Sequence, residues 1–252
     1  MTVARHNSIG IKQVIRLEWM QQTTRLLLAG LDTKGTRQAL HDFIAEQRGD
    51  ANDHKQSAMT RAFVVNNLMK IWASPEPELI TFRDASLACL RDNPSMAMSL
   101  HWGMVSAVYP FWYNVARQTG RLLALQDQVT QAQIIHRLKE QYGDRQTIFR
   151  YSQYVLRSFV AWGVLLDADT NGCYAKATPL TIASNTQVAL LYESALLATP
   201  DAKIALALLQ NNPALFPFQL PALSGSVVSQ HNNRIDVVRY GLNDELLKLK
   251  SL

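Results

Sequence analysis

The side chains best suited to chemistry lie between positions 145 and 157, where they could bind a nucleic-acid backbone and read base edges. Thr147, Arg150, Tyr154 and Arg157 follow one another at spacings of three, four and three, so a helix would carry them on one face. Guanidinium groups pair with phosphate oxygens or bidentately with guanine, and Thr and Tyr hydroxyls commonly contact phosphates. These residue types therefore indicate contact with DNA.

Two further polar residues, Arg145 and Gln146, stand at the expected start of this helix, where recognition helices usually meet base edges. From position 145 to position 157 the segment holds three arginines and no acidic residue. A plain solvated helix face, which is the alternative interpretation, usually pairs such charges with opposite charges one turn away. The missing acids favour contact with DNA.

Basic residues continue on both sides of this segment. From position 117 to position 157 there are seven Lys and Arg against three acids, an excess of four in a chain whose net charge is +5. We expect five more residues to contact phosphates: Arg117, Arg121, Arg137, Lys139 and Lys176. Arg117 and Arg121 have an equally good alternative, in which their stems pack on neighbouring aromatic side chains.

Other kinds of chemistry have little support in the sequence. The six histidines are scattered, and none has the Cys/His spacing of a zinc site. His101 lies in an apolar segment, where we expect a hydrogen-bonded core histidine. There is no Gly-rich phosphate loop, nucleophile elbow or cluster of acids with Lys. We therefore predict neither a metal nor a cofactor, and no catalytic residue.

Residues 129–177 must position the basic side chains, and they read as a short helix, a turn, a longer helix and a hairpin. Thr130 is placed to cap the first helix, and Gly143 can close it in a left-handed conformation. Asp144 can then cap the second helix, which Gly163 ends.

The hairpin that follows is expected to turn at Asn171-Gly172, a dipeptide that tolerates positive φ. Its tip carries Asp167 and Asp169, whereas a hairpin that reads DNA is often basic at the tip. For the tip we therefore expect a structural role, although Lys176 on the return strand can reach a phosphate.

This order of elements resembles the winged helix-turn-helix superfamily, over residues 110–177 if the preceding helix is counted as the first. The resemblance is one of pattern and includes no invariant signature residue. It implies that the second helix of the motif enters the major groove of double-stranded DNA. A minority of such domains dock only onto proteins.

The rest of the chain is predicted to be mainly helical, with a helical domain at 1–108, the winged domain at 109–178 and a helical and hairpin domain at 179–252. We expect one or two helices over 9–30 and an exposed polar loop at 48–53. In the last domain we expect helices at 185–197, 202–209 (capped by Asp201) and 243–250, and strands at 226–228 and 234–238. Residues 215–218 read as core, with a partner-docking patch as the alternative.

Composition limits the class of protein. At 252 residues with 48% hydrophobic and 18% charged residues, the chain can bury a substantial core. A pI near 9.3 is compatible with nucleic acid. Two distant cysteines favour a reducing cytoplasm, and no apolar run is long enough to span a membrane. The N-terminus also lacks an apolar signal core.

Taken together, the sequence predicts a mainly α fold: a helical bundle with a central winged helix-turn-helix and a C-terminal helical part with a second small β-hairpin. The expected function is non-enzymatic binding of double-stranded DNA in the cytoplasm, as a bacterial regulator or as a DNA-binding component of a nucleic-acid-processing or phage-defence system. The alternative is a structural subunit that docks onto proteins of a larger assembly and binds little DNA itself. A homodimer is a further option.

Overall fold

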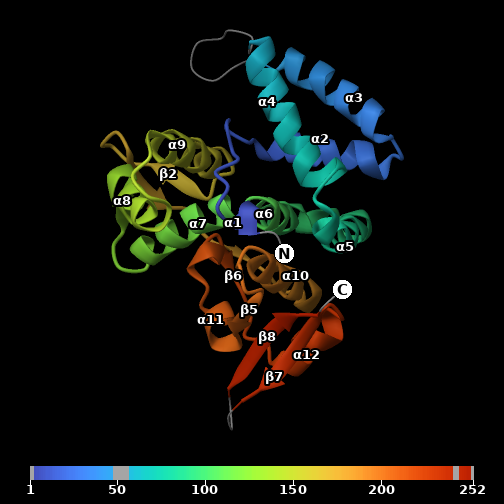
Figure 1. The fold of residues 1–252 in the computed structure, drawn as a ribbon, viewed down its shortest axis with the longest axis vertical. Helices are drawn as coiled ribbons and strands as arrows, with labels where there is room; N and C mark the ends of the chain where they lie inside the picture. The colour runs from blue at the N-terminus through green and yellow to red at the C-terminus, as the bar shows by residue number, and fades with distance from the viewer. Residues whose placement is uncertain (1–2, 48–56, 241–243, 251–252) are drawn as a thin grey trace.

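Two consecutive helices, α6 (Ala97–Val108) and α7 (Pro110–Leu123), run through the middle of the molecule, and the other elements pack around them (Figure 1). The computed structural model describes residues 3–47, 57–240 and 244–250. Within these ranges the chain is mainly helical, and its strands form three small sheets. No helix in this part of the chain is both long enough and apolar enough to cross a membrane.

The N-terminal helices cover one side of α6. They are α1 (Val3–His6), α2 (Leu17–Leu28), α3 (Thr33–Glu46), α4 (Ala58–Leu68) and α5 (Ile80–Asp92), with short π and 3₁₀ turns η1 (Met69–Ala73), η2 (Pro77–Leu79) and η3 (Pro94–Met96). Helix over 9–30 was expected throughout, but it begins only at Leu17. Residues 9–16 form neither helix nor strand, and Ile11 and Ile15 bury their side chains completely in the core. The polar loop expected at 48–53 lies outside the described residues.

A second group of elements packs on α7 and forms a lobe with it, in which α8 (Gln131–Tyr142) and α9 (Gln146–Ala161) lie beside a small sheet (Figure 1). This sheet is antiparallel with the order β1-β3-β2, from β1 (Gln128–Thr130), β2 (Leu165–Asp167) and β3 (Cys173–Lys176). We call α7, α8, α9 and this sheet the α9 lobe. The β2–β3 hairpin was expected, whereas strand β1, which pairs with β3 more than forty residues later in the chain, was not.

The caps of α8 and α9 decide how these helices begin. The Thr130 hydroxyl oxygen accepts a hydrogen bond from the backbone N–H of Gln133, and the Gln133 side-chain oxygen accepts one from the backbone N–H of Thr130, which confirms Thr130 as the N-cap. The prediction that Asp144 caps α9 is wrong, because Arg145 occupies the N-cap position and no side chain caps the helix there. Asp144 instead pairs with Lys139.

The C-terminal elements pack on the other side of α6 and α7 (Figure 1). They are α10 (Asn185–Leu197), α11 (Leu206–Gln210), the 3₁₀ turn η4 (Pro213–Leu215) and α12 (Gly225–His231), with a two-stranded parallel sheet of β4 (Leu180–Thr181) and β6 (Phe218–Gln219). A three-stranded antiparallel sheet has the order β5-β8-β7, from β5 (Lys203–Ala205), β7 (Ile235–Arg239) and β8 (Glu245–Leu249).

Three predictions for this last part of the chain are wrong. The helix expected at 202–209 begins as strand β5, after Ala202 takes a positive φ of 50°, and Asp201 caps nothing there. The strand expected at 226–228 is helix α12, whose N-cap is Ser224. The helix expected at 243–250 is strand β8 over its described residues, because β5 and β7 pair with it on both sides. Pairing with distant strands outweighs local helix propensity here.

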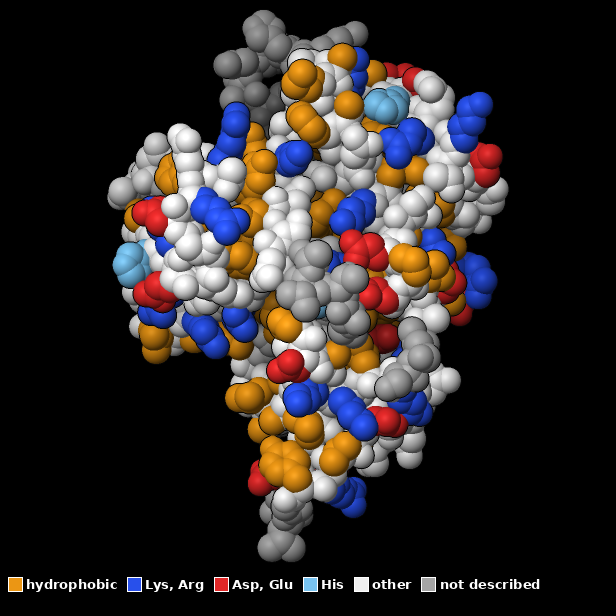
Figure 2. Space-filling view, viewed as in Figure 1, with side chains coloured by type: hydrophobic (Ala, Val, Ile, Leu, Met, Phe, Trp, Pro, Cys, Tyr) orange, Lys and Arg blue, Asp and Glu red, His pale blue; other side chains and the backbone are white. Residues whose placement is uncertain are grey.

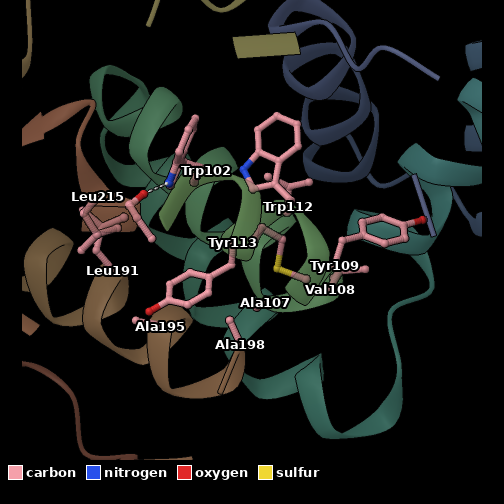
Figure 3. Close-up of a cluster of buried hydrophobic side chains, with 14 of the residues drawn as sticks. Trp102, Ala107, Val108, Tyr109, Trp112, Tyr113, Leu191, Ala195, Ala198 and Leu215 are labelled. Atoms are coloured by element: carbon pink, nitrogen blue, oxygen red, sulfur yellow. Dashed lines mark hydrogen bonds between the residues drawn. The ribbon is translucent and has the colours of Figure 1, made fainter. Parts of the chain in front are cut away.

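Trp102 joins the three parts of the chain in one core. Its ring lies 5.4 Å from that of Trp112 in α7 and 4.9 Å from that of Phe159 in α9. Its indole nitrogen donates to the carbonyl oxygen of Ala214 at 3.1 Å (Figure 3). A single hydrophobic cluster runs through all three predicted domains. The domain boundaries that we placed at 108 and 178 therefore remain a prediction from the sequence.

The apolar residues at 215–218 belong to this core. Leu215, Phe216 and Phe218 are buried, and the rings of Phe216 and Phe218 lie 5.8 and 6.0 Å from that of Trp102. These contacts favour the core interpretation over an exposed docking patch.

Candidate nucleic-acid interface

Helix α9 separates its residues into a buried face and an open one. Ile148, Ser152, Val155, Leu156, Ser158 and Phe159 are buried. On the opposite side, Arg145, Gln146, Arg150 and Arg157 are exposed, as the sequence spacing predicted. An amphipathic pattern of this kind leaves the polar face free for a ligand or for water.

Two other predicted residues, Thr147 and Tyr154, lie on one flank of this open face. Thr147 is exposed, while Tyr154 is partly buried against the core. The Tyr154 ring stacks on that of Tyr151, with 6.3 Å between centroids.

Sequence reasoning missed two exposed residues of α9. Gln153 lies three residues after Arg150 and four before Arg157, so the helical spacing itself contains the signal. Phe149 is 51% exposed on the other flank, beside Arg150. An exposed aromatic in this position adds an apolar contact to an otherwise polar face.

Arg157 is not free, contrary to the prediction that this basic face has no acidic partner. Its Nη1 lies 2.6 Å from Oδ1 of Asp167 in β2. The hydrogen bond to Asp167 is the largest contribution that raises the pKa of Arg157. The partner comes from the hairpin and not from the helix, so spacing within α9 could not reveal it.

Helix α8 carries the next two predicted phosphate contacts, of which one has an acidic partner and the other has none. Lys139 pairs with Asp144 across the turn between α8 and α9, with 2.8 Å between Nζ and Oδ1. Arg137 is exposed and lines a shallow pocket with Leu122 and His136. Arg137 remains available to a phosphate, whereas Lys139 would first have to leave its carboxylate.

Helix α7 carries the remaining pair. Arg117 is half-buried, lies over the Tyr113 ring at 6.0 Å, and donates to the Gln141 side chain at 3.2 Å. Burial lowers the pKa of Arg117. Its position matches the alternative in which the stem packs on aromatics. Arg121, one turn later, is exposed.

The side chains of five predicted cations therefore have no hydrogen bond or ion pair to another described residue: Arg121, Arg137, Arg145, Arg150 and Lys176. They come from α7, α8, the start of α9 and strand β3. Figure 2 shows Lys and Arg side chains scattered over the α9 lobe with acidic side chains between them. Two of them belong to the recognition helix proposed below: Arg145 is the N-cap of α9, and Arg150 lies within the helix.

Within the described ranges, no group of three or more His, Cys, Asp or Glu side chains could hold a metal ion. The interface is thus a set of cationic, amide, hydroxyl and aromatic groups on and around one exposed helix. Comparison of the chain with protein-family models, curated proteins and solved structures gave no match.

Proposed function

We propose that the chain binds double-stranded DNA through the open face of α9. The elements of the α9 lobe follow the order helix, strand, two helices and two strands, and their sheet has the order β1-β3-β2. This arrangement resembles a winged helix-turn-helix, in which α9 would be the recognition helix. The observation that carries the proposal is that Arg145 and Arg150 are exposed and unpaired among the described residues on a helix with no acidic residue.

In the proposed complex, α9 lies in the major groove with its N-terminal half against the bases. Arg150 and Gln146 can make bidentate contacts to guanine and adenine, and Phe149 can contact a thymine methyl group. Arg145, Arg137 and Lys176 supply phosphate contacts, which position the helix without reading sequence. The β2–β3 hairpin has a mainly structural part, because its Asp167 neutralises Arg157.

The test measures binding of a fluorescent duplex of about 20 base pairs, two turns of B-DNA, by anisotropy over a series of salt concentrations. The variant R145A/R150A should bind at least about tenfold more weakly at moderate salt, and its salt slope should fall by about 2. The control K34A/R91A removes the same charge from two exposed residues of α3 and α5. Unchanged binding in R145A/R150A, or an equal loss in the control, would contradict the proposal.

A second candidate function is docking onto a protein partner, and the exposure of Phe149 favours it. An aromatic side chain that is 51% exposed beside Arg150 has the composition of an interface hot spot. The discriminating variant is F149A with both arginines intact. A docking subunit should lose its co-purifying partner in F149A and show no duplex binding in either form. A DNA reader should keep its salt slope, because Phe149 contacts no phosphate.

A further inference from the structure

A cavity of about 260 Å³ lies where η2 and α5, the end of α10 and one end of the β7–β8 pair meet. Helix α10 packs between α5 and the β5-β8-β7 sheet in this part of the molecule (Figure 1). The lining includes Glu78, Glu193, Leu197, Arg234, Leu249 and Lys250. None of these residues belongs to the α9 lobe or takes part in the proposed DNA contact.

The guanidinium of Arg234 is held in a fixed orientation at the wall of this cavity. Its Nε and Nη2 donate to the two carboxylate oxygens of Glu193, each at 2.6 Å. The Glu193 side chain is only 3% exposed, and it accepts a third hydrogen bond from Nδ2 of Asn232 at 2.7 Å. Glu193 therefore occupies one edge of the guanidinium and sets its plane.

The other edge of the same guanidinium remains open. The Arg234 side chain is 24% exposed, and its Nη1 is accessible and has no hydrogen bond to another described residue. An arginine offers five N–H donors, of which Glu193 takes two. A guanidinium fixed in this way suits a second carboxylate, which it can bind through two parallel hydrogen bonds.

Lys250 places a second cation beside Arg234. The backbone N–H of Lys250 donates to the carbonyl oxygen of Arg234 at 2.9 Å, so the two residues lie side by side, just beyond the paired strands β7 and β8. The Lys250 side chain is 49% exposed, and its ion pair with Asp236 is long, with 3.8 Å between Nζ and Oδ1. An anion bound at Arg234 therefore has a second, weakly paired cation next to it.

A wall that comes from a different part of the chain carries the opposite charge. Glu78 in η2 pairs through Oε1 with Nη2 of Arg5 at 2.9 Å, and this oxygen is inaccessible. Oε2 of Glu78 is accessible and has no hydrogen bond or ion pair with another described residue. It can therefore accept from an ammonium group. Leu197 of α10 and Leu249 of β8 add apolar surface to the lining.

We propose that this cavity binds a free α-amino acid with an aliphatic side chain. The carboxylate would lie at Arg234 and Lys250, the ammonium at Glu78, and the side chain on the two leucines. The charges in the lining cancel, with two cations against two carboxylates, and they stand on separate walls. A zwitterion matches both walls, whereas a simple anion or cation matches only one. The cavity is smaller than the 300–1,000 Å³ typical of drug-sized ligands, as a single amino acid requires.

The experiment titrates L-leucine, 4-methylpentanoate and 3-methylbutylamine into the full chain by calorimetry. The two analogues keep the aliphatic part and lack the ammonium and the carboxylate, respectively. L-leucine should bind with a dissociation constant of about 1 mM or lower, and each analogue at least about threefold more weakly, because one charged contact is missing. In a parallel NMR titration of protein with labelled leucine methyl groups, the signal of Leu249, assigned with L249M, should shift.

The carboxylate end of the ligand is tested with K250M, which should weaken L-leucine at least about threefold. The matched control is K248M. Lys248 is exposed two residues earlier in the chain, pairs with the same Asp236 at 3.9 Å, and does not line the cavity. R234M is not suitable, because it would leave the buried Glu193 carboxylate without its cation.

The ammonium end is tested with E78Q, which should also weaken L-leucine at least about threefold. The matched control is E76Q, because Glu76 is the other acid that pairs with Arg5, at 3.6 Å, and does not line the cavity. Both controls should bind L-leucine as the native chain does. Absence of binding by the native chain, an unmoved Leu249 signal, or losses in the controls equal to those in K250M and E78Q would overturn the proposal. None of these results depends on whether α9 binds DNA.

Discussion

The guanidinium of Arg157 in α9 lies 2.6 Å from the carboxylate of Asp167 in β2. This contact ties the proposed recognition helix to the hairpin beside it. It also places a negative charge at the C-terminal half of a face that is otherwise basic. Both side chains are about half exposed, so the pair contributes little to the stability of the fold. Its main effect is on what that face can bind.

The first prediction follows from that pair. D167N should bind duplex DNA about two- to fivefold more tightly than the native chain, because it removes a repelling charge and releases Arg157 for a phosphate. For the same reason R157A should cost less affinity than R150A. Anisotropy titrations at moderate salt measure both effects.

The matched control for this prediction is D169N, which removes the same charge from an exposed position in the same hairpin. Asp169 forms no ion pair with another described residue, so D169N should change affinity less than D167N. Equal gains in the two variants would mean that net charge, and not the release of Arg157, sets the affinity.

The α9 lobe was largely predictable because its signals are local. The side chain of Thr130, the stop at Gly143 and the apolar spacing of Ile148, Val155 and Phe159 all act within a few residues of one another. The open face of α9 follows from the same spacing. Spacing could not show whether each cation has a partner. Arg157, Arg117 and Lys139 bind groups that lie outside their own helices.

The C-terminal sheet could not be predicted in this way. Leu246, Leu247 and Leu249 suit a helix as well as a strand, and the choice depends on pairing with β5, some forty residues earlier in the chain. Strand β5 is itself only three residues long. Residues 203–205 could also begin a helix, but they form a strand because they pair with β8. Local propensity therefore predicted a helix for both β5 and β8.

The second prediction concerns the contact between α7 and η4. A Cβ atom added at Gly120 would lie 1.9 Å from the carbonyl oxygen of Pro213, and 3.1 Å from Cβ of Phe216. Because the first of these atoms belongs to the backbone, α7 and η4 would have to separate. G120A should therefore lower the free energy of unfolding by about 1–3 kcal/mol or more, measured by chemical denaturation.

The control for Gly120 is Gly103, a buried glycine of α6. The nearest atom to an added Cβ at Gly103 is Cβ of Ser194 at 3.4 Å, which is close to ordinary contact. G103A should be tolerated, since the gain in helix propensity of about 1 kcal/mol offsets a slight displacement. Equal stability of G120A and the native chain would show that η4 is not fixed against α7.

The third prediction is a dependence of stability on pH that comes from His101. This residue is completely buried, and neither ring nitrogen bonds to another described residue, so the expectation of a hydrogen-bonded core histidine is wrong. In the folded chain burial lowers the pKa of His101 from 6.5 to about 3, so it stays neutral, whereas in the unfolded chain it takes up a proton near pH 6.5. Between these values the unfolded state binds more protons. The contribution of His101 is therefore complete above about pH 6.5, and it is lost as the pH falls toward about 3.

Denaturation of the native chain and of H101F, without added ligand, at pH values from 8 to 4 (about two pH units on either side of an unperturbed histidine pKa) isolates this contribution. The difference in unfolding free energy should be flat at the upper end and then fall by about 1.4 kcal/mol per pH unit against the native chain. H136Q is the control, because it removes an exposed histidine of α8 and leaves His101 in place. A difference between the native chain and H101F that stays constant down to the lowest pH would mean that His101 is protonated in the folded state, and hence is not buried in the way described.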